Sequence, residues 1–175
     1  LPHSSRVAAG SELMPRVVRR YEKPAFGLGH TVIDGETVAI HEEIVVEKPF
    51  CNLLRFRRET TSNHPKVLLV APLSGHYATL LRDTVFALLP DHDVHVTDWH
   101  DARLVPLAEG YFHFADYVAT MQDFIRLLAP DVHVISVCQP TVPVLAAVSL
   151  MAAEGDPARP RSMTLMGGPI DTRCA

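Results

Sequence analysis

The chain has 175 residues, of which 47% are hydrophobic and 21% are charged, and its formal net charge is −4 at pH 7. This composition indicates a globular domain with enough apolar material for a core, and it excludes disordered and collagen-like chains. The 16 basic residues are outnumbered by 20 acidic ones, and the only dense basic run is residues 55–58, so the composition argues against a nucleic-acid partner.

The N-terminal part of the chain predicts an extended lead-in followed by an antiparallel sheet edge. Residues 1–30 show no sustained hydrophobic period, and we expect a lead-in there; we assign residues 31–175 to a single folded portion. Asp34-Gly35 is a dipeptide typical of tight hairpins and lies between two β-rich runs. The extended runs are residues 31–33, 37–40, 43–46 and 53–56.

From residue 66 onward, short apolar runs alternate with segments that repeat near 3.6 residues. Strands are predicted over residues 66–71, 94–96, 132–137 and 162–166, and helices over residues 77–89, 114–129 and 142–153. Strands that alternate with helices imply βαβ crossovers and a parallel sheet. The predicted fold class is therefore α/β, mainly a parallel sheet with an antiparallel N-terminal edge.

Two of these helices carry further expectations. The segment 114–129 ends at Pro130, and its predicted buried face consists of Phe114, Tyr117, Val118, Met121, Ile125 and Leu128. The segment 142–153 is apolar nearly all round, which is typical of a helix buried against a sheet.

The most informative stretch is residues 132–141, VHVISVCQPT, in which an apolar strand runs directly into an apolar helix. Cys138 stands at the junction, where α/β-hydrolases carry their nucleophile between two small residues, and Ser136 and Pro140 fill those flanking positions. The partial positive charge of a helix N-terminus favours thiolate over thiol, so Cys138 is a candidate nucleophile. The alternative is a buried, inert cysteine at a strand end.

The loop after residues 66–71 supplies a second candidate element. In the same fold this loop gives one backbone N–H of the oxyanion hole, and the residue after the nucleophile gives the other. Leu73, Ser74 and Gln139 are therefore the candidate backbone donors. The alternative is that Pro72 and Gly75 simply make a turn.

Polar and aromatic residues also follow the strand at 94–96, at the edge where open α/β sheets place their ligands. Asp98 and Trp99 could line a pocket; alternatively, Asp98 caps the following turn and Trp99 packs in the core. Tyr77 and Trp99, together with Leu73, are candidates for an acyl pocket, and plain core packing is the alternative.

The cysteines and histidines predict neither a metal site nor a cofactor. Cys51, Cys138 and Cys174 are far apart with no CxxC pair, which argues against a zinc knuckle or disulfide framework and favours a reducing compartment. The ten histidines include no HExxH spacing. No apolar stretch approaches the length of a membrane span, and the first ten residues do not resemble a signal peptide, so we expect no membrane span and a cytoplasmic location.

Four motifs in this order resemble the intracellular polyhydroxyalkanoate (polyhydroxybutyrate) depolymerases: LLVAPLSGHYATLLRDTV, TDWHDARLVPLAEGYFHFADYV, VHVISVCQPTVPVLAAVSLMA and SMTLMGGPIDTR. The resemblance extends from about residue 21 to residue 173. It implies an α/β-hydrolase that cleaves ester bonds of stored poly(3-hydroxybutyrate) at a granule surface. It also implies a Cys-Asp-His triad, of which Cys138 matches the cysteine.

The other two triad members are expected in sequence that this chain lacks. No histidine follows Cys138, and the family's chains are longer, so the resemblance implies that this is an N-terminal portion whose Asp and His come from a complementary C-terminal segment or a second chain. A non-catalytic granule-binding or scaffold module, a general small-ester hydrolase and a polymer synthase are the alternatives. The TDW and GGPIDTR segments resemble depolymerases more than synthases.

Overall fold

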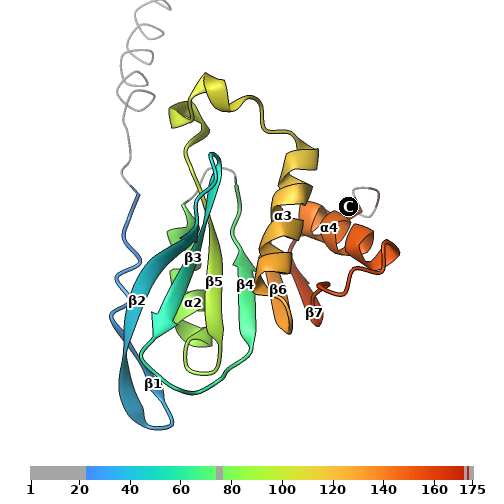
Figure 1. Cartoon of the computed structure of the whole chain (residues 1–175). Coiled ribbons are helices and arrows are strands. Elements are labelled where there is room, and N and C mark those ends of the chain that lie inside the picture. Colours follow the sequence, from blue (N-terminus) through green and yellow to red (C-terminus); the bar gives the residue numbers. More distant parts are fainter. Residues whose placement is uncertain (1–22, 74–76, 172, 174–175) are drawn as a thin grey trace, which may run out of the picture.

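The computed structural model describes residues 23–73, 77–171 and 173 (Figure 1). Ser74, Cys174 and most of the predicted lead-in lie outside these residues. The strands are β1 (His30–Ile33), β2 (Glu36–Val46), β3 (Cys51–Arg58), β4 (Lys66–Val70), β5 (Asp93–Trp99), β6 (Val132–Val137) and β7 (Ser162–Met166). The helices are η1 (Ala78–Leu81), α2 (Arg82–Leu88), η2 (Ala102–Leu104), η3 (Leu107–Glu109), α3 (Phe114–Leu128) and α4 (Thr141–Ala153).

The N-terminal hairpin forms as predicted. Asp34 and Gly35 have φ angles of 51° and 86°, and positive φ at both central residues is what a type I′ turn requires. β1 and β2 pair antiparallel on either side of this turn, with Ile33 opposite Glu36. β2 with β3 and β3 with β5 are also antiparallel, which confirms the predicted antiparallel edge.

The seven strands form one mixed sheet in the order β1-β2-β3-β5-β4-β6-β7. The pairs β5 with β4, β4 with β6, and β6 with β7 are parallel. The sheet therefore has the predicted parallel core. Because parallel strands point the same way, the carboxyl ends of β4, β5, β6 and β7 lie at one edge of the sheet.

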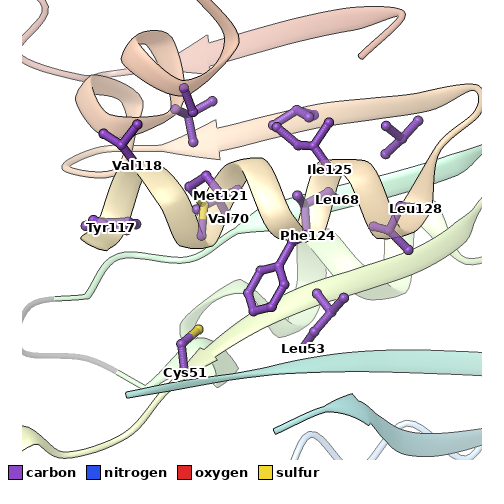
Figure 2. Close-up of a cluster of buried hydrophobic side chains, with 14 of the residues drawn as sticks. Cys51, Leu53, Leu68, Val70, Tyr117, Val118, Met121, Phe124, Ile125 and Leu128 are labelled. Carbon is purple, nitrogen blue, oxygen red and sulfur yellow. The ribbon is translucent and has the colours of Figure 1, made fainter. Parts of the chain in front are cut away.

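One face of the sheet is covered by α3 and α4 (Figure 1). Figure 2 shows the α3 side chains packed over residues of β3 and β4, among them Cys51, Leu53, Leu68 and Val70. The predicted face of α3 is buried except at Phe114, which is 56% exposed, while Phe124 is buried instead. Phe114 is the first residue of α3, and helical side chains lean toward the N-terminus, so its ring lies toward the preceding loop.

The opposite face is covered by α2, η1 and the segment that precedes β1. Phe26 is 1% exposed and packs edge-on against Phe56 with ring centroids 4.9 Å apart, so the end of the predicted lead-in belongs to the core. The predicted helix over 77–89 is two pieces, because the chain forms the 3₁₀ turn η1 before α2 begins at Arg82.

α4 is buried on one side, and its outer side is partly exposed although the helix is apolar nearly all round. Its buried residues are Thr141, Pro143, Val144, Ala147 and Met151, whereas Leu150 is 47% exposed. α4 contacts α3 and β6 with one side only, so an apolar composition does not by itself make a helix fully buried. Within the described part of the chain, no helix is both long and apolar enough to cross a membrane.

Candidate active site

Cys138 stands at a sharp turn between β6 and α4. Its backbone N–H donates to the carbonyl of Met166 at 2.7 Å, so the pairing of β6 with β7 continues up to this residue. Its φ angle is +67°, a left-handed conformation that costs a residue with a side chain about 1–2 kcal/mol. Cys138 is exposed, so it is not the buried cysteine of the alternative interpretation.

Thr141 and Gly168 hold this turn, and neither belongs to the residues that the sequence predicts for the site. The Thr141 hydroxyl donates to the carbonyl of Cys138 at 2.8 Å, and the Thr141 side chain is fully buried. Gly168, in the loop after β7, lies so close that a Cβ atom there would stand 1.7 Å from Thr141 Oγ1. The threonine after Gln-Pro and the glycine pair before Pro169 are the only signals that the sequence offers for this contact.

The two small positions that flank Cys138 are both buried. Ser136 is 0% exposed, and its hydroxyl has no hydrogen-bond partner among the described residues, so the residue contributes small size rather than a polar contact. Pro140 is the N-cap of α4 with φ −68°, where its missing N–H leaves no donor unpaired. Both observations agree with a turn that has little room beside Cys138.

The loop after β4 reaches the same turn. The Leu73 N–H donates to the side-chain oxygen of Gln139 at 3.2 Å, so two of the three predicted oxyanion donors are neighbours in the structure. Among the backbone hydrogen bonds between described residues, none engages the Gln139 N–H. The third predicted donor, Ser74, lies outside the described residues.

The predicted pocket residues have different surroundings. Trp99 is 5% exposed, stacks edge-on against Tyr117 and donates its indole N–H to the carbonyl of Ala71 at 2.9 Å, so it packs in the core. Tyr77 is half-buried just before η1. That either residue lines an acyl pocket stays a prediction.

Asp98 does not cap the turn that follows β5, so that expectation is wrong. Its carboxylate accepts from Lys23 Nζ at 2.5 Å. Asp101 is the cap instead, because its side chain accepts from the backbone N–H of Arg103 at 3.0 Å. Asp98 is still within the strand and faces inward, whereas Asp101 precedes the first residue of η2.

Cys51 and Cys138 should react very differently with an alkylating reagent. Cys51 is 1% exposed beneath α3, and burial raises the pKa of its thiol, as does the nearby Asp98 carboxylate. We expect iodoacetamide to label Cys138 in the folded chain and Cys51 only after denaturation, as read by peptide mass spectrometry. Faster labelling of Cys51 in the folded chain would contradict this assignment.

Comparison with solved structures identifies the fold. A variant of LAE6, an alpha/beta hydrolase enzyme from the metagenome of Lake Arreo in Spain, matches with a TM-score of 0.51 and 13% identity over 96% of this chain and 52% of its own. The 2-hydroxy-6-oxo-6-phenylhexa-2,4-dienoate hydrolase BphD from Rhodococcus sp. strain RHA1 matches with a TM-score of 0.51 and 17% identity over 75% of this chain and 47% of its own. The chain thus spans about half the length of these neighbours.

Two further comparisons found nothing: no protein-family model matches the chain, and no curated protein matches it. The solved structures therefore establish the fold, and the family resemblance rests on the sequence motifs alone. The chain has the α/β-hydrolase fold in part, as a mixed sheet with a parallel core and antiparallel N-terminal strands.

Proposed function

We propose that the chain carries the nucleophile of an enzyme that hydrolyses carboxylic esters through a thioester at Cys138. The observation that carries this proposal is the exposed thiol at a left-handed turn between β6 and α4, with the Leu73 loop against the same turn. A nucleophile at a strand-to-helix turn with backbone donors beside it is the arrangement that α/β-hydrolases use for acyl transfer. The neighbours of the same fold, one of them described as an alpha/beta hydrolase enzyme, support it.

In the proposed reaction the Cys138 thiolate attacks the ester carbonyl carbon. The negative charge that forms on the carbonyl oxygen is stabilised by the N–H groups of Leu73 and Gln139. The carbon–oxygen bond to the alcohol then breaks, the alcohol oxygen takes a proton, and the acyl group stays on sulfur as a thioester. Water activated by a general base releases the acid and restores the thiol.

The resemblance implies that a histidine oriented by an aspartate supplies that base from sequence beyond this chain. The chain by itself is therefore expected to form the thioester and to release it slowly. The proposed substrate is poly(3-hydroxybutyrate) or a related short-chain polyhydroxyalkanoate, and the proposed place of action is the surface of a storage granule in the cytoplasm.

An exposed apolar segment supports a polymer rather than a small soluble ester. We call residues 104–114 the apolar arm; it connects β5 to α3 and extends beyond the carboxyl ends of β4 and β5 (Figure 1). Four of its large side chains are exposed, Leu104 by 64%, Leu107 by 93%, Tyr111 by 84% and Phe114 by 56%, whereas Phe112 packs against the core. Glu109 is the only acidic or basic residue, apart from a histidine, in these eleven positions. Such a segment suits an uncharged, insoluble polyester better than a charged partner.

The apolar arm gives a direct test of the polymer substrate. The arm variant combines Leu107→Asp and Tyr111→Asp. We expect each substitution to lower the affinity for amorphous poly(3-hydroxybutyrate) granules by roughly tenfold, as measured by co-sedimentation. Leu127→Asp is the matched control, because Leu127 is 55% exposed on α3 outside the arm.

Three outcomes of this experiment separate the alternatives. Equal granule binding by wild type, the arm variant and the control would exclude the arm as the contact. Reaction with a soluble aryl ester without any granule binding would favour a general small-ester hydrolase. Granule binding without reaction at Cys138 would favour a non-catalytic granule-binding module.

A further inference from the structure

The Gln139 side chain accepts a hydrogen bond from the Leu73 N–H, one of the two donors proposed for the substrate oxygen. Its carbonyl oxygen accepts from the Leu73 N–H at 3.2 Å, whereas the sequence predicts a role only for the backbone N–H of Gln139. A side-chain amide oxygen resembles an ester carbonyl oxygen in shape and in acceptor capacity. We propose that the Gln139 side chain blocks the Leu73 donor, and so lowers substrate affinity, until a substrate carbonyl displaces it. This inference rests on the function proposed above.

The backbone of Gln139 is fixed by its neighbours. Cys138 sets the left-handed turn before it, Pro140 follows it with a rigid ring, and Thr141 bonds back to the carbonyl of Cys138. The side chain therefore starts from a defined position and reaches across to the loop after β4. Gln139 is half-buried and Leu73 is 37% exposed, so the contact between them is not enclosed in the core.

The Leu73 N–H does not need Gln139 to hold it in place. Ala71, two residues earlier, donates its N–H to the Thr97 hydroxyl at 2.9 Å and accepts the Trp99 indole N–H at 2.9 Å, and both bonds are buried. Pro72 is also buried and has a fixed φ. The strand end is thus anchored on β5, and this independent anchor favours a blocking role for Gln139 over a positioning role.

A blocking role has a kinetic signature. A substrate must first replace one neutral carbonyl acceptor with another, so the block weakens substrate binding. Once the substrate is bound the side chain is displaced, and the rate of the chemical step no longer depends on it. Removing the acceptor should therefore lower the substrate concentration at half-saturation and leave the maximal rate constant unchanged.

The test compares wild type with Gln139→Met, which keeps the length of the side chain and removes the acceptor. Acylation by p-nitrophenyl butyrate is followed as the first-turnover release of p-nitrophenolate. We expect the half-saturating concentration to fall by about 2- to 10-fold, the range of one neutral hydrogen bond, with the same maximal rate constant. Gln139→Glu offers a charged, stronger acceptor to the Leu73 N–H, and we expect it to raise the half-saturating concentration at neutral pH.

The outcomes distinguish this inference from the proposed function. A Gln139→Met variant with a lower maximal rate constant and an unchanged half-saturating concentration would show a positioning role and overturn the blocking role. A Gln139→Met variant whose half-saturating concentration and maximal rate constant both equal those of the wild type would overturn it as well. No acylation in the wild type would overturn both the proposed function and this inference. The Leu73 amide proton resonance gives a readout without chemistry, because it should shift in Gln139→Met when its acceptor is lost.

Discussion

Cys138→Ala is expected to abolish the first-turnover release of p-nitrophenolate, with a loss on the order of 10⁴-fold or more because the attacking atom itself is removed. Alanine keeps the Cβ atom at the left-handed turn, so the variant should fold with nearly the wild-type free energy of unfolding. Stopped-flow absorbance measures the release, and chemical denaturation measures the stability. A full burst from folded Cys138→Ala would exclude this residue as the nucleophile.

Cys51→Ala is the matched control for the loss of a thiol. Cys51 lies in the core beneath α3, so its removal creates a small cavity and is expected to lower the free energy of unfolding by about 1 kcal/mol. Its buried thiol does not reach solvent, so the burst should persist. The two variants therefore separate an effect on chemistry from an effect on stability.

Among the glycine-to-alanine substitutions at described positions, we expect Gly168→Ala to be the most damaging. The new Cβ would lie 1.7 Å from Thr141 Oγ1 and 2.5 Å from Thr141 Cβ, far inside contact distance. Thr141 is fully buried and bonded to the carbonyl of Cys138, so it cannot give way without moving the turn. We expect the free energy of unfolding to fall by about 1–3 kcal/mol. Acylation should fall by roughly 10²-fold, because a shift near 1 Å misplaces the nucleophile.

Gly29→Ala is the control for this substitution. Nothing lies within 4 Å of a Cβ at Gly29, and its φ is outside the left-handed region, so we expect little change in stability or acylation. Equal stability of the two variants in a denaturant titration would mean that Gly168 does not pack against Thr141 as described.

The parts of the fold that depend on local pattern could be predicted from the sequence. Asp34-Gly35 specifies its own turn, and the apolar runs of β4 and β6 indicate buried parallel strands without knowledge of their neighbours. The exposure of Phe114 and of the outer side of α4 could not be predicted, because it depends on what each helix lies against.

The candidate site also has features that local sequence predicts and features that depend on distant segments. The position of Cys138 follows from a strand that runs directly into a helix, which is a local pattern. The contacts of Gly168 with Thr141 and of Leu73 with Gln139 join segments far apart in the sequence, and no periodicity encodes them. The candidate nucleophile could therefore be predicted from the sequence. The contact that holds the turn, Gly168 with Thr141, and the contact of the Gln139 side chain with Leu73 could not.

Peptide mass spectrometry after incubation with p-nitrophenyl butyrate shows directly whether Cys138 forms a covalent acyl intermediate. We expect one butyryl group per chain, located on the peptide that contains Cys138 and removed by neutral hydroxylamine, as a thioester is. The adduct should accumulate wherever the general base that the family resemblance implies is not in place to activate water. A butyryl group on another residue of the folded chain, or no adduct at all, would contradict the account.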